Sequence, residues 1–311
     1  MRTRSALAVL FPFAFAACSA ETITSPEAAG PDYPIQGEYS GEASGAQVIA
    51  LGGGKFQIVG WMPGLPGTAE TVERKVEVEA ESAEGKVVFD SEGWKGEISN
   101  NTLTGSHKEG GEWTLKRVER ESPTLGAKPP EGAVVLFDGT GTDAWQDGKL
   151  DANGHLMAGT KSKQSFGDVS MHLEFRTPFM PDARGQARGN SGVYLQDRYE
   201  VQVLDSFGLT GENNQCGAIY ETSKPLVNMC YPPLAWQTYD IDFRAARFEG
   251  DKKVEDAVIT VRHNGVLVQD AVKVPEATRS AGMEVSPEPG PIQLQNHGDP
   301  AVYRNIWVVE K

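Results

Sequence analysis

Residues 189–205 have the sequence GNSGVYLQDRYEVQVLD, and this stretch decides the fold of the chain around it. Apolar and polar side chains alternate with a period of two along 192–196, and they do so again along 199–204. That period is typical of β-strands with one buried face and one polar face. The stretch therefore predicts two successive strands whose polar sides carry amides and a carboxylate.

The same alternation recurs over the rest of residues 132–311, and no convincing amphipathic helix interrupts it. The dipeptide Asn264-Gly265 is a tight-turn signal between two of the predicted strands. Many short alternating strands in one unit indicate two packed sheets, so we expect an all-β sandwich of jelly-roll type. The further predicted strands are 170–176, 239–243, 257–262, 292–295 and 303–309.

A smaller β-rich unit precedes the sandwich. Within residues 32–121, short β-type runs alternate with Gly and Asn turns, which predicts a small antiparallel sheet or barrel. This unit shows no catalytic constellation, and we expect it to be a spacer or accessory surface. The Pro-rich segment 122–130 is predicted to connect it to the unit 132–311, and the small polar residues 19–31 are predicted to form a flexible tether.

The first residues predict export. Two arginines precede an apolar run, 6–17, that is too short to span a bilayer. The run ends in Phe-Ala-Ala-Cys, which resembles a bacterial lipoprotein cleavage site, so residues 1–18 are predicted to be a signal peptide and Cys18 to be acylated. Ordinary secretion with cleavage near Ala17 or Ala20 is the alternative. We expect a periplasmic or outer-membrane lipoprotein.

Cys216 and Cys230 are the only cysteines besides Cys18. In an oxidising compartment two cysteines this close in sequence usually pair, so we predict a disulfide between them. A loop of this length would contribute on the order of 3 kcal/mol by restricting the unfolded chain. A metal pair is disfavoured, because no nearby histidine offers tetrahedral spacing.

The formal net charge is −14, because 43 Asp and Glu residues outnumber 29 Lys and Arg residues. So acidic a surface repels phosphate backbones, which argues against a nucleic-acid partner. It suits a neutral or cationic ligand, although a merely solubilising surface has the same charge. Contact with a membrane is expected through the lipid anchor only.

Several predicted strands carry carboxylates and amides on their outward faces, where Thr, Ser and Lys are usual. Glu200 and Gln202 share one such face near Asn190, and Glu174 shares another with Arg176. Sugar hydroxyls are bound by groups of this kind, and apolar sugar faces pack on aromatic rings. If these side chains converge on one curved sheet, they form a carbohydrate groove. Further candidates for the groove are Tyr194, Tyr220, Tyr231, Trp236, Gln293, Gln295 and His297.

Each of these features also has a plainer interpretation. The Glu-x-Gln pattern is common on solvated strand faces, Glu174 and Arg176 could form a cross-strand ion pair, and the aromatic rings could pack the core. His297 could cap a turn. The interpretation as a sugar site gains weight because the polar runs recur on several strands with a common outward phase.

Seven short motifs follow one another along the second unit. They are LFDG (136–139), GNSGVYL (189–195), YEVQVLD (199–205), GAIY (217–220), WQTY (236–239), LQNHG (294–298) and YRNI (303–306). Taken in order, they resemble the 3-keto-disaccharide hydrolase family, over residues 134–310 and not over residues 19–130. The resemblance implies a concanavalin-like jelly-roll sandwich and an exported glycosidase that acts on sugars already oxidised at carbon 3 by a partner dehydrogenase. The positions carried over as functional are Asn190, Glu200, Gln202, Asp205, His297 and Arg304.

The implied chemistry begins at the ketone. A ketone at carbon 3 acidifies the hydrogen on carbon 2, so one base can start elimination of the group at carbon 1, and water then adds back. We expect Glu200 to be the base and His297 to be the acid or an oxyanion donor, while Arg304 or Arg176 stabilises the negative charge. The remaining substrate contacts are expected from Glu174, Arg176, Asn190, Tyr194, Gln202, Asp205, Trp236 and Gln295.

No cofactor is required by this route. A divalent metal ion could replace the arginine, with Asp205, Glu200 and His297 as its ligands, although their spacing matches no metal motif. Three other functions remain open. They are a carbohydrate-binding module without catalysis, a classical glycosidase on an unoxidised sugar with Glu174 and Glu200 as its carboxylates, and an adhesion or scaffold protein in which the first unit matters most.

Overall fold

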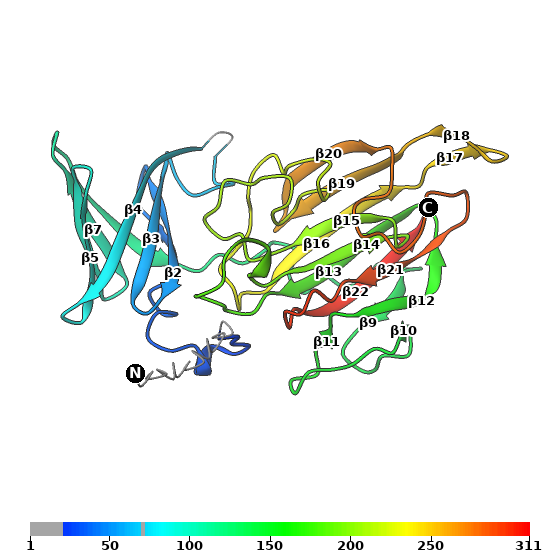
Figure 1. Cartoon of the computed structure of the whole chain (residues 1–311), viewed down its shortest axis with the longest axis horizontal. Coiled ribbons are helices and arrows are strands. Elements are labelled where there is room, and N and C mark those ends of the chain that lie inside the picture. The colour runs from blue at the N-terminus through cyan, green and yellow to red at the C-terminus, as the bar shows by residue number, and fades with distance from the viewer. Residues whose placement is uncertain (1–20, 70–71) are drawn as a thin grey trace, which may run out of the picture.

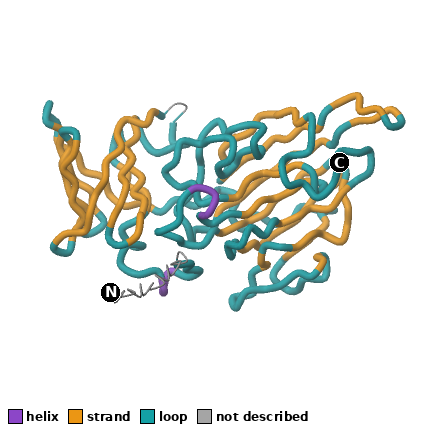
Figure 2. Tube along the Cα trace, in the orientation of Figure 1, coloured by secondary structure: helices purple, strands orange, loops and turns teal. Residues whose placement is uncertain are grey.

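The computed structural model describes residues 21–69 and 72–311, so the predicted signal peptide and Cys18 lie outside the described residues. The described chain is built of β-strands, with two single-turn 3-10 helices at Pro26–Ala28 and Gly185–Ala187. Figures 1 and 2 show two bodies side by side, a barrel of N-terminal strands and a larger sandwich. The prediction of an all-β fold is confirmed. Among the described residues, no helix has the length and apolar character to cross a membrane.

The N-terminal body is a closed barrel in which each strand pairs antiparallel with the next and β1 pairs with β8. Alternate residues point inward and form a core that includes Val48, Phe56 and Leu103. Glycine-rich and Asn-containing turns connect the strands, as the sequence predicts. The strands are β1 (Gly37–Ser40), β2 (Gly45–Gly52), β3 (Lys55–Met62), β4 (Glu73–Ala83), β5 (Lys86–Ser91), β6 (Trp94–Ser99), β7 (Thr102–His107) and β8 (Glu112–Val118).

The C-terminal body is a two-sheet sandwich, as expected for a jelly roll. One sheet has the strand order β10-β12-β21-β14-β15, and the other has the order β11-β22-β13-β16-β19-β20 with β9 beside β22. A separate ribbon joins β17 to β18. The strands are β9 (Val134–Phe137), β10 (Trp145–Gln146), β11 (Leu156–Met157), β12 (Thr160–Phe166), β13 (Val169–Arg176), β14 (Ser191–Leu195), β15 (Tyr199–Val203), β16 (Gln237–Arg244), β17 (Arg247–Glu249), β18 (Lys252–Glu255), β19 (Ala257–His263), β20 (Val266–Val274), β21 (Gly290–Leu294) and β22 (Val302–Glu310).

The core of the sandwich comes from the apolar half of each alternating strand. Val193 and Val201 contribute to it from the five-stranded sheet, and Leu173 and Ile241 contribute from the other sheet. Because neighbouring residues on a strand point to opposite faces, the polar residues between them lie on the two outer faces of the sandwich. The sandwich therefore has two separate polar faces, one on each sheet.

The two bodies share buried surface. On β2 and β3 the side chains that point out of the barrel, including Ile49, Val59 and Trp61, belong to the same hydrophobic cluster as the core of the sandwich. Arg74 adds a hydrogen bond from its guanidinium to the carbonyl of Gly208 at 3.0 Å. The barrel is thus docked on the sandwich through an apolar face.

The prediction of a flexible tether over residues 19–31 is wrong for its described part. Ile23 forms a β-bridge with Phe179, with N–H···O distances of 3.0 and 2.8 Å in the two directions. Ile23 and Ala29 are buried in the barrel core together with Leu234 of the sandwich. The prediction rested on the small, polar composition of the whole segment and overlooked these two apolar residues, which hold the segment against both bodies.

The predicted disulfide is not formed, because Cys216 and Cys230 are free, buried thiols. The two thiols are hydrogen-bonded to each other, and each sulfur also has an oxygen partner in the core. Cys216 Sγ lies 3.1 Å from the hydroxyl of Tyr239, and Cys230 Sγ lies 3.4 Å from the carbonyl of Leu204.

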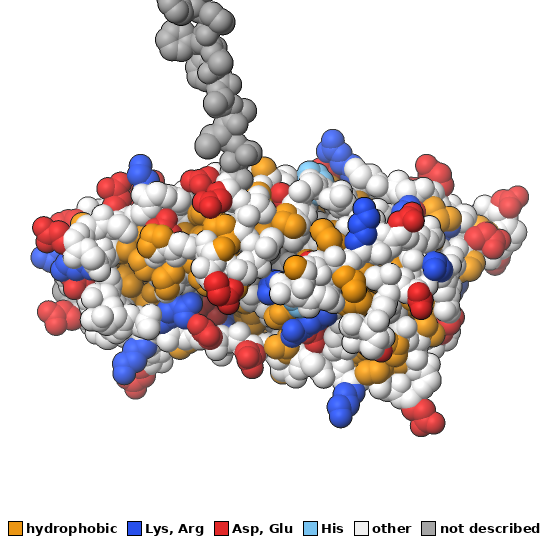
Figure 3. All heavy atoms as spheres, turned by 90° about the horizontal axis from the view of Figure 1, so that it is seen from below, with side chains coloured by type: hydrophobic (Ala, Val, Ile, Leu, Met, Phe, Trp, Pro, Cys, Tyr) orange, Lys and Arg blue, Asp and Glu red, His pale blue; other side chains and the backbone are white. Residues whose placement is uncertain are grey.

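Charged side chains are scattered on the face shown in Figure 3. Lys and Arg side chains lie among acidic ones on that face, and hydrophobic side chains reach the surface between them. This distribution fits the interpretation of the net negative charge as a solubilising surface.

Candidate functional site

A polar pocket of about 280 Å³ lies on the outer face of the five-stranded sheet. Strands β14, β15 and the end of β21 form its floor, because β14 pairs with β15 on one side and with β21 on the other. The 3-10 helix Gly185–Ala187 and a loop after β20 form its walls. The lining residues are Gln186, Asn190, Glu200, Gln202, Tyr220, Arg279, Ser280, Gln295 and His297.

Glu200 is the chemical centre of this pocket. The neighbouring residue Val201 faces the core, so the side chain of Glu200 points to the outer face of the sheet. Glu200 is nevertheless buried, with only 2% of its surface exposed. Burial is the main reason that the pKa of Glu200 is raised to about 7, and the nearby charge of Glu221 adds to it. The hydroxyl of Tyr194 donates to Glu200 Oε2 at 2.8 Å, and this hydrogen bond lowers the pKa of Glu200. A carboxylate with this pKa can accept a proton near neutral pH.

Gly192 makes room for that carboxylate. Gly192 faces Gln202 across the β14–β15 ladder, and Tyr194 faces Glu200. A Cβ atom at Gly192 would overlap Glu200 Oε1. A side chain at this position would therefore fill the floor of the pocket.

Amide side chains surround Glu200 in a hydrogen-bonded network. Gln202 donates to Gln186 Oε1 at 3.1 Å, and Asn190 donates to the Gln186 carbonyl at 2.8 Å. Gln186 itself donates to the carbonyl of Asn214 at 2.8 Å. Within the described chain, Asn190 Oδ1 is buried without a hydrogen-bond partner. Because this oxygen has almost no exposed surface, a hydroxyl group reaches it only if a neighbouring side chain moves.

Gln295 and His297 reach the same pocket from the end of β21. The side-chain amide of Gln295 donates to the Tyr194 hydroxyl at 3.2 Å, and its backbone N–H donates to the Gly192 carbonyl at 2.8 Å. His297 is exposed at the edge of the pocket, where a bound molecule could reach its imidazole. The structure thus brings Glu200 and His297 to one face, as the alternation indicates.

Among the residues that the structure describes, one arginine lines this pocket, and the sequence interpretation missed it. Arg279 lies on the loop between β20 and β21, and its guanidinium is 3.1 Å from Glu221 Oε1. The loop has no strand periodicity, so only the path of the chain brings Arg279 to the pocket. Gln186 was missed for the same reason, because it lies on a single helical turn.

Arg304 is not in this pocket, and the prediction that it acts beside Glu200 is wrong. Arg304 lies on β22 of the other sheet, where its Nε donates to Glu174 Oε2 at 2.6 Å. Arg304 and Arg176 both stack on Trp236, at 4.0 and 5.0 Å from the ring centroid. The predicted substrate contacts of Glu174, Arg176 and Trp236 are therefore also wrong for the Glu200 pocket.

Glu174 instead holds the connector between the two bodies. It accepts hydrogen bonds from the Gly126 backbone at 2.6 Å and from Asn305 Nδ2 at 2.9 Å. Burial by itself would raise the pKa of Glu174, but hydrogen bonds from His172, Asn305 and Arg304 outweigh it and lower the pKa to about 2. The second polar face of the sandwich is thus a structural ion-pair network.

Asp205 and Tyr194, two of the predicted substrate contacts, are buried and do not line the pocket. Asp205 instead pairs with Arg188 at 2.6 Å. The three residues considered as metal ligands therefore do not come together at one site. They are Asp205, Glu200 and His297. Across 21–69 and 72–311, no three His, Cys, Asp or Glu side chains gather closely enough to hold a metal ion.

Comparison with known proteins gives a family and a structural relative. The model of a family described as the 3-keto-alpha-glucoside-1,2-lyase-like domain matches residues 132–309, which span the sandwich and exclude the barrel. A "putative glycosyl hydrolase" from Parabacteroides distasonis ATCC 8503 has 35% identity and a TM-score of 0.53, over 58% of this chain and 85% of that one. A second structure described in the same words, from the same organism, has 15% identity and a TM-score of 0.40, over 58% and 94%. No curated protein matches the chain.

Proposed function

The chain belongs to the family of 3-keto-alpha-glucoside-1,2-lyase-like domains through residues 132–309, and from that premise we propose that it cleaves 3-keto-glycosides in the pocket around Glu200. The observation that carries this proposal is a buried carboxylate with a pKa of about 7 among amides suited to sugar hydroxyls. The similarity to a glycosyl hydrolase supports the general class of reaction.

In the proposed reaction Glu200 removes the proton from carbon 2 of the 3-keto sugar. The electron pair of that C–H bond forms an enolate with the oxygen on carbon 3. When the enolate collapses, the bond from carbon 1 to the glycosidic oxygen breaks, and His297 supplies the proton for the leaving oxygen. Water then adds across the double bond between carbons 1 and 2 to release the 3-keto sugar. No step requires a second carboxylate.

Charge stabilisation in this proposal falls to Arg279. The enolate develops negative charge, and a fixed cation or N–H donor near it lowers the barrier. Arg279 takes the role that we first expected of Arg304, while Asn190, Gln202 and Gln295 bind hydroxyls. Glu174 and Glu200 lie on different sheets, which disfavours a classical glycosidase that uses them as its pair of carboxylates.

The direct test is the variant Glu200→Gln, assayed by mass analysis with a 3-keto-glucoside and with its unoxidised parent. We expect turnover of the 3-keto-glucoside to fall by about 10²–10⁴-fold, because a general base contributes about that much. Glu249→Gln, the same change at an exposed site on β17, is the control. Near-normal turnover in Glu200→Gln would remove Glu200 from the role of base. Binding of the 3-keto-glucoside without any product in the wild type would leave a carbohydrate-binding module.

We further propose that the protein is exported and anchored through Cys18, and that a sugar 3-dehydrogenase supplies its substrate. In a bacterial expression host, Cys18→Ser should move the protein from the membrane fraction to the soluble fraction. Co-incubation of the parent glycoside with such a dehydrogenase should allow cleavage, which neither protein achieves alone. Cleavage of the parent glycoside without the dehydrogenase would contradict the coupling.

A further inference from the structure

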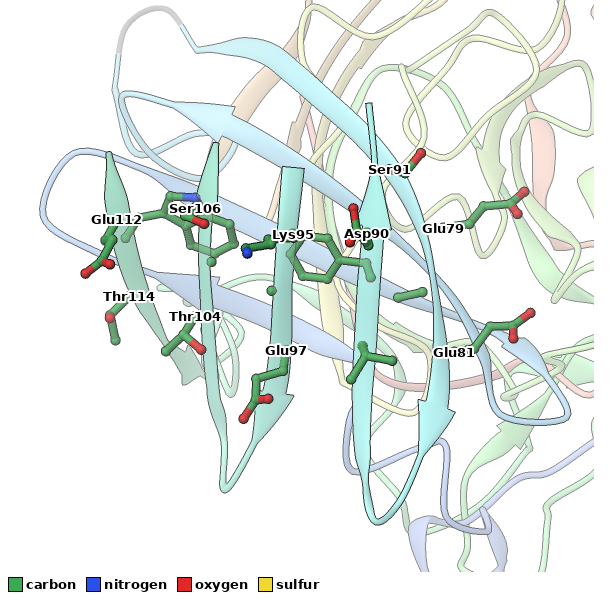
Figure 4. Close-up of a pocket in the computed structure, with 16 residues that line it drawn as sticks. Glu79, Glu81, Asp90, Ser91, Lys95, Glu97, Thr104, Ser106, Glu112 and Thr114 are labelled. Atoms are coloured by element: carbon green, nitrogen blue, oxygen red, sulfur yellow. The ribbon is translucent and has the colours of Figure 1, made fainter. Parts of the chain in front are cut away.

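The carboxylates of the barrel and of the sandwich pocket are stabilised in different ways. Figure 4 shows a groove on the barrel whose acidic side chains come from several strands. The exposed ones, whose charges water solvates, are Glu79, Glu81, Asp90 and Glu112. Glu200 in the sandwich pocket is buried, so its charge depends on the protein groups that contact it. The partners of Glu200 therefore bear directly on its role as a base.

The two carboxylate oxygens of Glu200 have different surroundings. Oε2 accepts the hydrogen bond from the Tyr194 hydroxyl at 2.8 Å. Within the described chain no group donates to Oε1, and this oxygen is not sealed from the pocket. Its lone pairs are therefore the ones that a sugar in the pocket meets. Tyr194 thus holds one oxygen of Glu200 and leaves the other free to take a proton.

The hydroxyl of Tyr194 has more partners than it has hydrogens. Tyr194 is fully buried, and its oxygen accepts from the side-chain amide of Gln295 at 3.2 Å. Two acceptors lie beside it, Glu200 Oε2 at 2.8 Å and the backbone carbonyl of Arg279 at 3.1 Å. Burial raises the pKa of Tyr194 above its usual value, so the hydroxyl keeps its single hydrogen at neutral pH. That hydrogen has to choose between the two acceptors.

The charge of Glu200 decides the choice. An ionised carboxylate is the stronger acceptor and the closer one, so the hydrogen lies on Glu200 while Glu200 is charged. Once Oε1 takes a proton, Oε2 belongs to a neutral acid and loses that advantage over the Arg279 carbonyl. A proton on Oε2 would act in the same way, because Oε2 would then donate to Tyr194. The hydroxyl only turns about its C–O bond, and no bond of Tyr194 breaks.

The Arg279 carbonyl belongs to the loop that carries the cation of the pocket. This loop is fixed to β15, since the backbone N–H of Glu200 donates to Thr278 Oγ1 at 2.9 Å. The N–H of Ala281 closes a turn on the Thr278 carbonyl at 3.2 Å, which leaves the Arg279 carbonyl to Tyr194. Ser280 has a φ of 63°, a left-handed conformation that a non-glycine residue adopts only when its surroundings impose it. One more hydrogen bond therefore matters to the position of this turn.

We propose that Tyr194 is a positioning residue. It holds Glu200 so that Oε1 faces the sugar, and its hydroxyl turns to the Arg279 carbonyl once Glu200 has taken the proton. The loop then gains a hydrogen bond when the enolate carries its negative charge, which holds the guanidinium of Arg279 at the pocket. This inference rests on the proposed function of Glu200 as the base. The other titratable or charged groups that face Glu200 are Tyr220, Glu221, Arg279 and His297.

The first test is Tyr194→Phe, which keeps the ring and removes the hydroxyl. Infrared difference spectra taken across the pH range report the protonated carboxyl of Glu200 as the band that is absent from Glu200→Gln. We expect the midpoint of this band to rise by about one pH unit in Tyr194→Phe, because the hydrogen bond to the ionised form is lost. Tyr39→Phe makes the same change at a buried tyrosine of the barrel and should leave the midpoint unchanged.

The second test follows the loop by amide hydrogen exchange of peptides that cover 276–284, corrected for the intrinsic rate at each pH. Measurements at pH 6 and pH 8 lie on either side of the pKa of Glu200, about 7. In the wild type we expect about fivefold more protection at pH 6, where Tyr194 binds the loop. This difference should vanish in Tyr194→Phe. It should also vanish in Glu200→Gln, which carries no charge at either pH.

An unchanged carboxyl midpoint in a folded Tyr194→Phe variant overturns the proposal, and so does equal loop protection at the two pH values in the wild type. If circular dichroism shows that Tyr194→Phe does not fold, Glu200→Gln decides, and a pH dependence of the loop that persists in this variant overturns the proposal. Neither readout involves a sugar. Failure of the proposed glycoside cleavage would instead appear as normal turnover in Glu200→Gln.

Discussion

At the scale of single residues, Glu200 owes its chemistry to its immediate neighbours. Burial raises its pKa to about 7, while the Tyr194 hydroxyl holds one of its oxygens in place. A carboxylate whose pKa is near the working pH combines a useful basicity with a large ionised fraction. One buried position on β15 thus meets both requirements of a general base.

A pH profile follows from this pKa. A base must be ionised to act, and the ionised fraction of Glu200 grows as pH rises through about 7. We expect kcat/KM for a 3-keto-glucoside to rise as pH increases towards 7, by up to about tenfold per pH unit. Initial rates measured from pH 5.5 to 8.5 check this. A profile that is flat over that range would contradict a base with this pKa.

Gly192 offers a second prediction at this scale. Gly192→Ala places a methyl group where Glu200 Oε1 lies, so the carboxylate must move or the pocket must deform. We expect kcat to fall at least tenfold, since small displacements of a catalytic group are costly. Gly167→Ala, where a Cβ atom meets nothing within 4 Å, is the matched control. Equal activity of the two variants would show that the position of Glu200 tolerates the added methyl group.

At the scale of elements, the connector 122–127 is held on the seven-stranded sheet by the Glu174 network. Thr124 donates to Asp240 at 2.7 Å, Gly126 donates to Glu174, and the Ala127 carbonyl accepts from Asn305 at 3.0 Å. Glu174, which we expected to bind sugar, therefore binds the connector instead. This role accounts for the charged and amide groups of Glu174, Arg304 and Asn305 on this face.

The Glu174 network predicts a loss of stability in acid. The pKa of Glu174 is lowered in the folded protein from 4.5 to about 2, so its contribution is complete above pH 4.5 and is lost as pH falls towards 2. Urea denaturation at several pH values should therefore show a smaller acid dependence in Glu174→Gln than in the wild type. Glu249→Gln should behave as the wild type. Parallel curves for Glu174→Gln and the wild type would show that this carboxylate is not the cause.

The neighbouring His172 acts in the other direction on the pH scale. Burial alone would lower the pKa of His172, but its hydrogen bonds to Asp240 and Glu174 raise it above 6.5. Its contribution is therefore present below pH 6.5 and is lost as pH rises through its raised pKa. Together these two pKa shifts stabilise the folded protein most between pH 4.5 and pH 6.5, where both contributions are present.

At the scale of the whole molecule, barrel and sandwich share one continuous apolar interface. Ile49, Val59 and Trp61 of the barrel are buried in the cluster that forms the core of the sandwich. The N-terminal segment adds Ile23, which pairs with Phe179. Because large buried interfaces couple the unfolding of the parts they join, the two bodies should not behave as independent units.

We therefore expect thermal unfolding in a single transition. Differential scanning calorimetry of the full chain should give one peak, and a chain that begins at residue 131 should melt at a lower temperature. The shorter chain loses both the apolar interface and the Gly126 partner of Glu174. Two separate peaks in the full chain, one of which matches the short chain, would contradict this coupling.

Sequence alone determined the secondary structure and the family. Strict alternation, as in 199–204, specifies a strand and separates its apolar side from its polar side, since that period is a local property of the backbone. The strands expected at 170–176, 192–196 and 303–309 all occur, and the family match confirms the resemblance drawn from seven motifs. Two hydrogen-bonding groups near Glu200 were found in this way, because Gln202 alternates with apolar residues on β15 and Asn190 directly precedes β14.

Only the tertiary structure decided which polar residues meet. A two-sheet sandwich has two outer faces, one on each sheet. Alternation shows that a side chain points outward, but it does not show on which sheet the strand lies, because that depends on pairing between strands distant in sequence. β21 lies between β12 and β14, while β22 lies beside β13, so His297 joins Glu200 and Arg304 joins Glu174. Arg279 and Gln186 reach the pocket from loops, whose paths leave no periodic trace in the sequence.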